Sequence, residues 1–143
     1  MPVSANAAAA LRGTTALNGR LASAAEPLSA ALADTPFPVT DVVKVLRRMS
    51  SDTRAATAMV GSLGDWPAAS SHQAQLGAFY DQLTGEINAG LGASVTSADS
   101  YRASTREILA TLRSIVSLDA TARDLAAQSG ITLPPIVIPA ALR

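Results

Sequence analysis

Apolar residues recur along much of this chain at the spacing of an amphipathic helix. The longest series runs from Asp41 to Leu63, and its members are Val42, Val45, Leu46, Met49, Ala56, Met59, Val60 and Leu63. A second series begins after Ser70 and contains Leu76, Phe79, Tyr80, Leu83, Ile87 and Leu91. Because residues three and four apart share one face of a helix, both series predict long helices with one buried side.

Two further helical segments flank this pair. Leucines mark the segment from Ser4 to Asp34, at positions Leu11, Leu17, Leu21, Leu28 and Leu32. Proline is tolerated in the first turn of a helix but not inside one, so Pro27 predicts a break near Glu26. The other segment carries Tyr101, Thr105, Ile108, Leu112, Ile115, Asp119 and Ala122 in a near-heptad series. It is either one long helix, or two helices of which the second is capped by Ser117 or Asp119. Gly130 is a suitable residue to end it, with Ile131 making the accompanying apolar contact.

The expected fold class is all-α, an up-down bundle of three or four helices with an extended apolar C-terminal tail. We divide the chain into a helical segment (1–34) broken at Pro27, a proline-rich linker (35–40), a bundle core (41–130) and a C-terminal arm (131–143).

Glycines interrupt the second apolar series. We expect Gly77 and Gly85 to allow close packing of the backbone, and Gly90 and Gly92 to mark fraying of the helix end. A turn and a helix cap are expected between Ser94 and Ser97.

The tail is the most unusual segment. Pro134, Pro135 and Pro139 exclude a regular helix and favour an extended path. Disordered tails are poor in branched aliphatic residues, whereas this tail contains Ile131, Leu133, Ile136, Val137, Ile138 and Leu142. We predict that these six residues form an interaction site, and two alternatives remain open: the tail closes its own bundle, or it docks on another subunit.

Composition leaves little material for a catalytic or metal site. The 143 residues include thirty alanines but no cysteine, one histidine and three glutamates. We expect His72 to be a surface or capping residue, and Asp81, Glu86 and Glu107 to be solvated charges, because none has the spacing of a metal or carboxylate site. The sequence therefore predicts a protein that is not an enzyme and has no cofactor, metal or small-molecule substrate.

Charge gives no sign of a nucleic-acid partner. Eleven basic and eleven acidic residues cancel, and the densest basic cluster, Lys44, Arg47, Arg48 and Arg54, is offset by Asp41 and Asp52. We interpret this cluster as a solvated helix face. No apolar run approaches the roughly 20 residues that span a bilayer, and Met1 to Arg12 does not have the pattern of a secretory signal. Localisation stays open.

Trp66, the only tryptophan, lies between the two clearest helices and is also a predicted interaction residue. The order of helix, tryptophan turn and helix resembles the WXG100 family of small secreted helical hairpins, and the segment from Tyr101 to Thr105 lies where that family has its tyrosine-based secretion signal. Ala68 replaces the family's glycine, and Thr105 stands where the signal has an acid. The resemblance implies an adaptor that pairs with a partner protein.

Two functions follow from these observations. The first is a non-enzymatic structural or assembly subunit that contacts other protein subunits through helix packing and the arm. A phage virion or tail-type particle is a suitable setting by analogy. The alternative is the secreted, WXG100-like hairpin.

Overall fold

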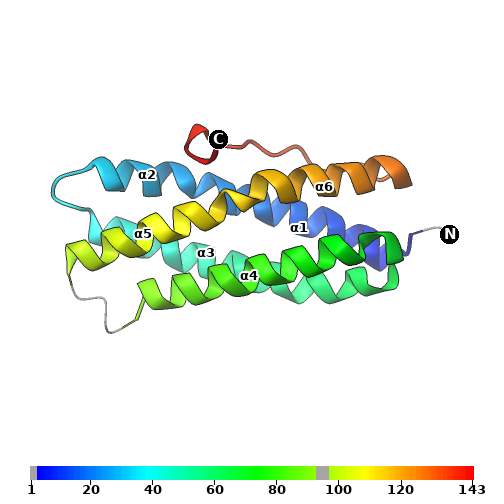
Figure 1. Ribbon diagram of the computed structural model, residues 1–143, viewed down its shortest axis with the longest axis horizontal. Coiled ribbons are helices and arrows are strands. Elements are labelled where there is room, and N and C mark those ends of the chain that lie inside the picture. Colours follow the sequence, from blue (N-terminus) through cyan, green and yellow to red (C-terminus); the bar gives the residue numbers. More distant parts are fainter. Residues whose placement is uncertain (1–2, 93–96) are drawn as a thin grey trace.

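The computed structural model describes residues 3–92 and 97–143, and all regular structure in these ranges is helical. Four rods pack side by side in up-down order (Figure 1), which confirms the all-α bundle and settles the number of rods. The first rod is α1 (Ala5–Ser23) followed by α2 (Ala25–Ala33), the second is α3 (Val39–Val60), the third is α4 (Ser70–Gly90), and the fourth is α5 (Ala98–Leu112) followed by α6 (Ser114–Ser129). Three short 3₁₀ turns complete the description: η1 (Gly61–Asp65), η2 (Pro67–Ala69) and η3 (Ala140–Leu142).

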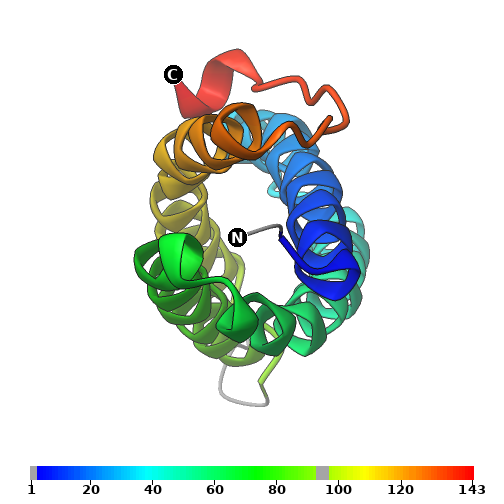
Figure 2. The ribbon, with the colours of Figure 1, turned by 90° about the vertical axis from the view of Figure 1, so that its right-hand side faces the viewer.

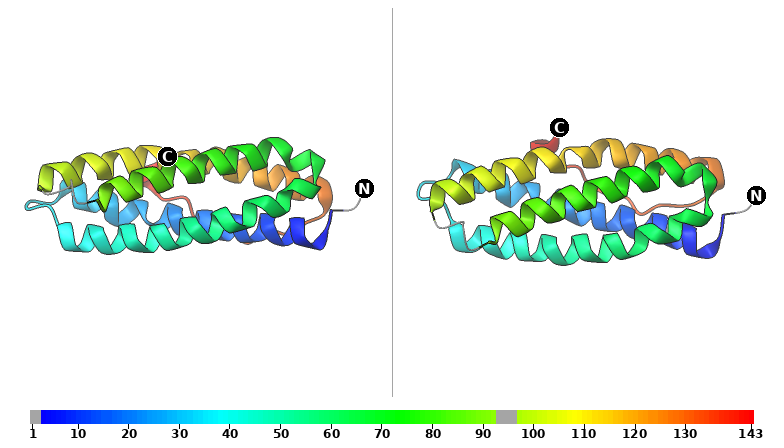
Figure 3. Two further views of the ribbon diagram at one scale, coloured as in Figure 1. Left: turned by 90° about the horizontal axis from the view of Figure 1, so that it is seen from below. Right: turned by 60° about the horizontal axis from the view of Figure 1, so that its bottom comes forward.

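The rods form a closed ring when viewed along the bundle (Figure 2). Each rod packs against the one before it and the one after it, and the first rod packs against the fourth. The line along which the first and fourth rods meet is one seam of this ring. The C-terminal segment lies on the outside of the bundle along this seam (Figures 2 and 3).

Two rods are broken in the middle. The break in the first rod falls at Ala24, slightly before the expected position, and leaves Pro27 in the first turn of α2. Proline is tolerated there because the amide it lacks has no partner in the first turn. The fourth rod breaks at Arg113, so the near-heptad series spans two helices, α5 and α6. The second helix begins at Ser114, before the caps expected at Ser117 or Asp119.

Serine side chains begin two of the helices. The Ser4 hydroxyl accepts a hydrogen bond from the Ala7 amide at 3.1 Å, and the Ser97 hydroxyl accepts one from the Ser100 amide at 3.1 Å. Ser97 is therefore the cap expected before α5, whereas the rest of the predicted turn, 94–96, lies outside the described residues.

Among the glycines of α4, Gly90 is the one that packs against other rods. A Cβ atom on Gly90 would lie 3.3 Å from Leu46 Cδ1 and 3.5 Å from Ser104 Cβ, so this glycine brings three rods together. A Cβ on Gly77 or Gly85 would meet nothing within 4 Å. The expectation of close packing at Gly77 and Gly85 is wrong, and Gly90 is ordered at the end of the helix rather than frayed.

Large aliphatic side chains from all four rods meet on the bundle axis. Those with the least exposure include Leu11, Leu21, Leu28, Leu46, Met49, Leu76, Leu83, Ile87, Ile108, Leu112 and Ile115. Alanines such as Ala7, Ala22 and Ala56 fill the positions between them. Small side chains let the rods approach closely, so a core with few aromatic residues still excludes water.

Candidate interaction site: the C-terminal arm and its groove

The turn after α6 sends the chain back along the bundle. Gly130 has a φ of 68°, a left-handed conformation that costs glycine little, and the Ile131 amide donates to the Ala126 carbonyl at 2.9 Å. Ile131 is half-buried against the core. The helix therefore ends as the sequence predicted, and the reversal at Gly130 starts the arm, residues 131–143.

The arm runs along the seam between the first and fourth rods (Figures 1 and 3), which we call the arm groove. Its last turn, η3, packs against α2 and α5. In this structure of a single chain, the tail lies on its own bundle.

Two arginines hold the main chain of the arm. Arg12 Nε of α1 donates to the Thr132 carbonyl at 3.2 Å, and Arg123 Nη2 of α6 donates to the Pro134 carbonyl at 3.0 Å. Arg123 is oriented by Asp119, whose Oδ2 accepts from Arg123 Nε at 2.9 Å. Guanidinium groups form strong hydrogen bonds to oxygen acceptors. The two bonds therefore fix the register of the arm on the first and fourth rods.

A glycine on α1 makes room for the arm. A Cβ atom on Gly19 would lie 2.7 Å from Ile136 Cγ2 and 3.0 Å from Ile136 Cβ, closer than such atoms approach in proteins. At the far end, Leu142 is buried, with 3% of its surface exposed. Ile136 and Leu142 thus anchor the middle and the end of the arm on the bundle.

The six predicted arm residues divide into two groups. Leu142 is buried, and four others are half-buried against the core: Ile131, Leu133, Ile136 and Ile138. Val137 points the other way and is 77% exposed. Only Val137 therefore offers most of its side chain to another molecule.

Trp66 lies apart from the arm. It occupies the connection between the second and third rods, between η1 and η2, and is 7% exposed. No hydrogen bond from its indole joins it to another residue in 3–92 or 97–143. Trp66 is therefore a core residue of the connection and is separate from the arm groove.

His72 is buried, so the expectation of a surface or capping histidine is wrong. It lies in the first turn of α4 but is only 2% exposed, and its Nδ1 is buried without a hydrogen-bond partner among the described residues. Burial lowers the pKa of His72, so the neutral imidazole is favoured. The spacing gave a signal that we missed, because His72 precedes Leu76 by four residues and Phe79 by seven, on the core face.

The three acids singled out from the sequence do not all behave alike. Asp81 and Glu107 are exposed, as expected for solvated charges. Glu86 is half-buried, and its Oε1 is enclosed without a partner in the described part of the chain. The same ranges contain no group of three or more His, Cys, Asp or Glu side chains placed to bind a metal ion.

One buried polar pair crosses the bundle. The Tyr80 hydroxyl of α4 donates to Asn18 Oδ1 of α1 at 2.6 Å, and both side chains are almost fully buried. Burial raises the pKa of Tyr80, so its hydroxyl stays protonated and able to donate. Both groups are neutral and paired, so this contact fixes how the first and third rods face each other rather than supplying a reactive group.

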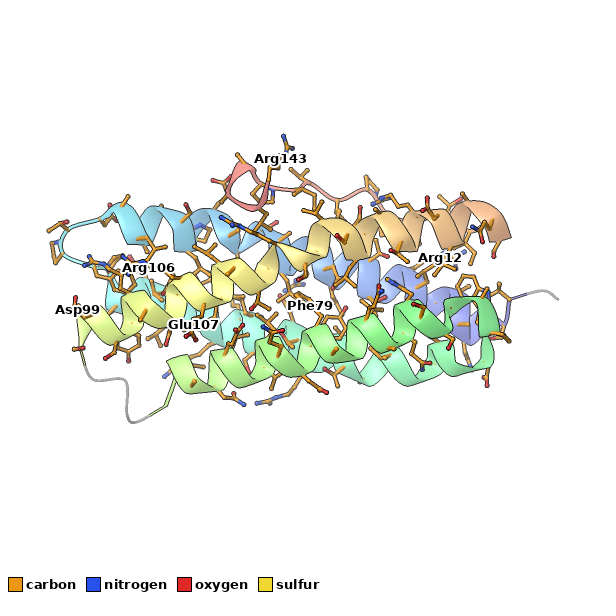
Figure 4. All side chains as sticks on the ribbon, viewed as in Figure 1. Arg12, Phe79, Asp99, Arg106, Glu107 and Arg143 are labelled. Atoms are coloured by element: carbon orange, nitrogen blue, oxygen red, sulfur yellow. The ribbon has the colours of Figure 1, made fainter. Side chains whose placement is uncertain are left out.

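Shallow cavities away from the arm include the following two. One, of about 360 Å³, lies between α4 and α6 near Phe79 (Figure 4), and its lining residues are Gln75, Ala78, Phe79, Gln82, Ser114, Ser117 and Leu118. The other, of about 260 Å³, includes Arg48 from the basic cluster. Asp52 lines it too and pairs with Arg20 at 3.2 Å. Neither cavity collects the predicted interaction residues.

Comparisons of the chain with protein-family models, with curated proteins and with solved structures gave no match. The resemblance at Trp66 therefore rests on the residues named above. No helix in the described ranges has the length and apolar character needed to cross a membrane.

Proposed function

We propose that this protein is a non-enzymatic structural or assembly subunit of a larger protein complex, and that it contacts other subunits through its helices and its arm. The observation that supports this most is the outward side of the arm. Its main chain is held by two arginines, while Val137 is directed into solvent with 77% of its surface exposed.

An anchored apolar side chain suits a protein contact. Val137 and Val116 of α6 are the large hydrophobic residues most exposed in the described ranges. A single exposed valine is common on protein surfaces. Here, however, the arginine bonds to Thr132 and Pro134 hold the arm before Val137, and buried Leu142 holds it after Val137. A partner that buries Val137 therefore loses less conformational entropy than it would by ordering a free tail.

The chemistry of the arm favours a protein as its partner. Residues 131–142 carry no charged side chain, so the outward edge offers nothing to the phosphates of a nucleic acid. Pro135, Val137 and Ala140 are its exposed nonpolar residues. The proposal involves no cofactor and no small-molecule substrate, and we suggest a phage virion or tail-type particle as its setting by analogy.

Native mass tests this proposal. Light scattering and native mass spectrometry of the purified full chain, and of the complex recovered from its source, should give masses well above the 14.5 kDa of one chain. Val137→Asp should lower the assembled fraction, because it places a charge on the proposed contact. Ala74→Asp, at an exposed position of α4, is the matched control and should not. A single-chain mass from both sources would contradict the proposal.

One observation favours the second candidate, a WXG100-like adaptor. α3 and α4 form an antiparallel hairpin with buried Trp66 in its connection, which is the arrangement that prompted the resemblance. In that case the same measurement would give a heterodimer with one partner protein rather than a particle.

A further inference from the structure

We propose that the arm can leave its own groove and occupy the arm groove of a second copy, which returns its own arm in exchange. This inference rests on the proposed function, because it names another copy of the same chain as a subunit that the arm contacts, through its inward side rather than through Val137.

The receptor for the arm is made entirely of bundle residues. Arg12 and Gly19 come from α1, and Arg123 comes from α6. Every copy therefore carries the same receptor and the same arm. Exchange would re-form both arginine bonds and the contact of Ile136 with Gly19 between two chains, which is the condition for swapping a terminal segment.

Gly130, which connects α6 to the arm, can act as a hinge. Gly130 is exposed and left-handed, and the first anchored residue, Thr132, follows only two positions later. Because glycine adopts many backbone conformations at low cost, rotation at Gly130 can redirect the arm without unfolding α6.

Proline keeps a released arm extended. Pro134, Pro135 and Pro139 each fix one backbone angle, so the free segment samples fewer conformations than an ordinary tail. An extended path covers about 3.1 Å per residue, which lets the arm span several turns of a neighbouring helix. The arm therefore loses little conformational freedom when it enters a second groove.

A second copy fits this groove better than an unrelated segment. The groove has a notch at Gly19 that accepts Ile136 and a site between α2 and α5 that buries η3 with Leu142. The arm matches both features at the correct separation. Because eleven basic and eleven acidic residues cancel, copies do not repel one another through net charge.

Engineered cysteines test the exchange, since the natural chain has none. Ile136 Cβ lies 3.0 Å from the position of a Cβ on Gly19, so a small shift gives the separation of a disulfide. Full-length Gly19→Cys and Ile136→Cys proteins would be mixed, incubated and oxidised, and the linked peptides identified by mass spectrometry. Exchange predicts a covalent dimer joined between positions 19 and 136. Val137→Cys replaces Ile136→Cys in the control mixture and should give at least tenfold less of the corresponding dimer, because Val137 faces outward.

The double variant Gly19→Cys/Ile136→Cys completes the test. If it forms only an intrachain disulfide and the mixed single variants give no dimer linked between positions 19 and 136, the arm stays in its own groove and the proposal is overturned. No disulfide in either sample overturns it too, because the arm then does not lie against Gly19. If the natural chain has a high native mass and the variants form only intrachain disulfides, the proposed assembly function is supported. The exchange of arms alone is then contradicted.

Discussion

Ile136 of the arm lies so close to Gly19 of α1 that a Cβ atom on Gly19 would fall 2.7 Å from Ile136 Cγ2. The position of the arm therefore depends on the absence of a side chain at position 19 of α1. In an isolated helix, alanine is favoured over glycine by about 1 kcal/mol. At position 19, alanine would stabilise α1 in the same way, but its Cβ atom would also displace the arm.

Gly19→Ala should therefore loosen the arm while leaving helicity intact. Thermolysin, which cleaves beside aliphatic residues, should cut residues 131–142 several-fold faster in the variant than in the natural protein. Gly85→Ala is the matched control, since a Cβ there meets nothing within 4 Å. It should raise stability by about 0.5–1 kcal/mol without changing cleavage of the arm. Equal cleavage rates for the two variants would show that Gly19 does not position the arm.

The pair of Tyr80 and Asn18 should show strong coupling in stability. Tyr80→Phe leaves the buried Asn18 amide without its partner and should cost about 1–3 kcal/mol. Asn18→Leu should cost a similar amount. The double variant Asn18→Leu/Tyr80→Phe should be more stable than the sum of the two losses predicts, because neither polar group is left unpaired. Urea unfolding of the four proteins measures this, and strictly additive losses would mean that the hydrogen bond does not form.

Leu112 and Arg113 are neighbours that differ in burial. Leu112 is fully buried at the end of α5, whereas Arg113 is exposed at the junction with α6. Leu112→Ala should cost about 2–5 kcal/mol, as deletion of a buried leucine usually does. Arg113→Ala should cost less than about 0.5 kcal/mol. If thermal melts gave the two variants the same stability, the packing of the fourth rod would be different from that described.

His72 should make the protein less stable in mild acid. Its pKa is lowered in the folded state by burial, while the unfolded chain has the ordinary value of about 6.5. Below that value the unfolded state binds more protons than the folded state. The contribution of His72 to the free energy of unfolding is therefore fully present above pH 6.5. It is lost as the pH falls from 6.5 toward the lower pKa of the folded state.

Since His72 is the only histidine, a substitution isolates its effect. Urea midpoints at pH 7.5 and 5.5 should differ in the natural protein and differ less in His72→Gln. An unchanged pH dependence in the variant would show that His72 does not titrate on unfolding.

The sequence predicted the helices because their apolar residues repeat at a local period. The series from Val42 to Ala56 and from Leu76 to Ile87 each lie on one helix face, and both helices have the predicted type and place. Gly130 was likewise identified from its local sequence as the residue that ends α6. These features depend on residues within a few positions of each other.

The features that the sequence did not predict depend on residues far apart. Arg12 meets the Thr132 carbonyl across 120 positions, and nothing near either residue indicates this bond. The close packing at Gly90 depends on Leu46 and Ser104 from two other rods. The sequence also left open whether the arm lies on its own bundle or on a neighbouring subunit, because the residues that the arm contacts are far from it in the sequence. By contrast, His72 was misassigned although its spacing to Leu76 and Phe79 placed it on the core face.

Removal of residues 131–143 tests most directly the claim that the arm is the assembly element of this protein. Circular dichroism and native mass would be measured on the truncated and the full chain under the same conditions. We predict that the four rods stay helical and that the assembled mass falls to that of a single chain. Unimpaired assembly without the arm would contradict the account. Loss of the cooperative melt would contradict it too, because the arm would then be needed to complete the bundle core.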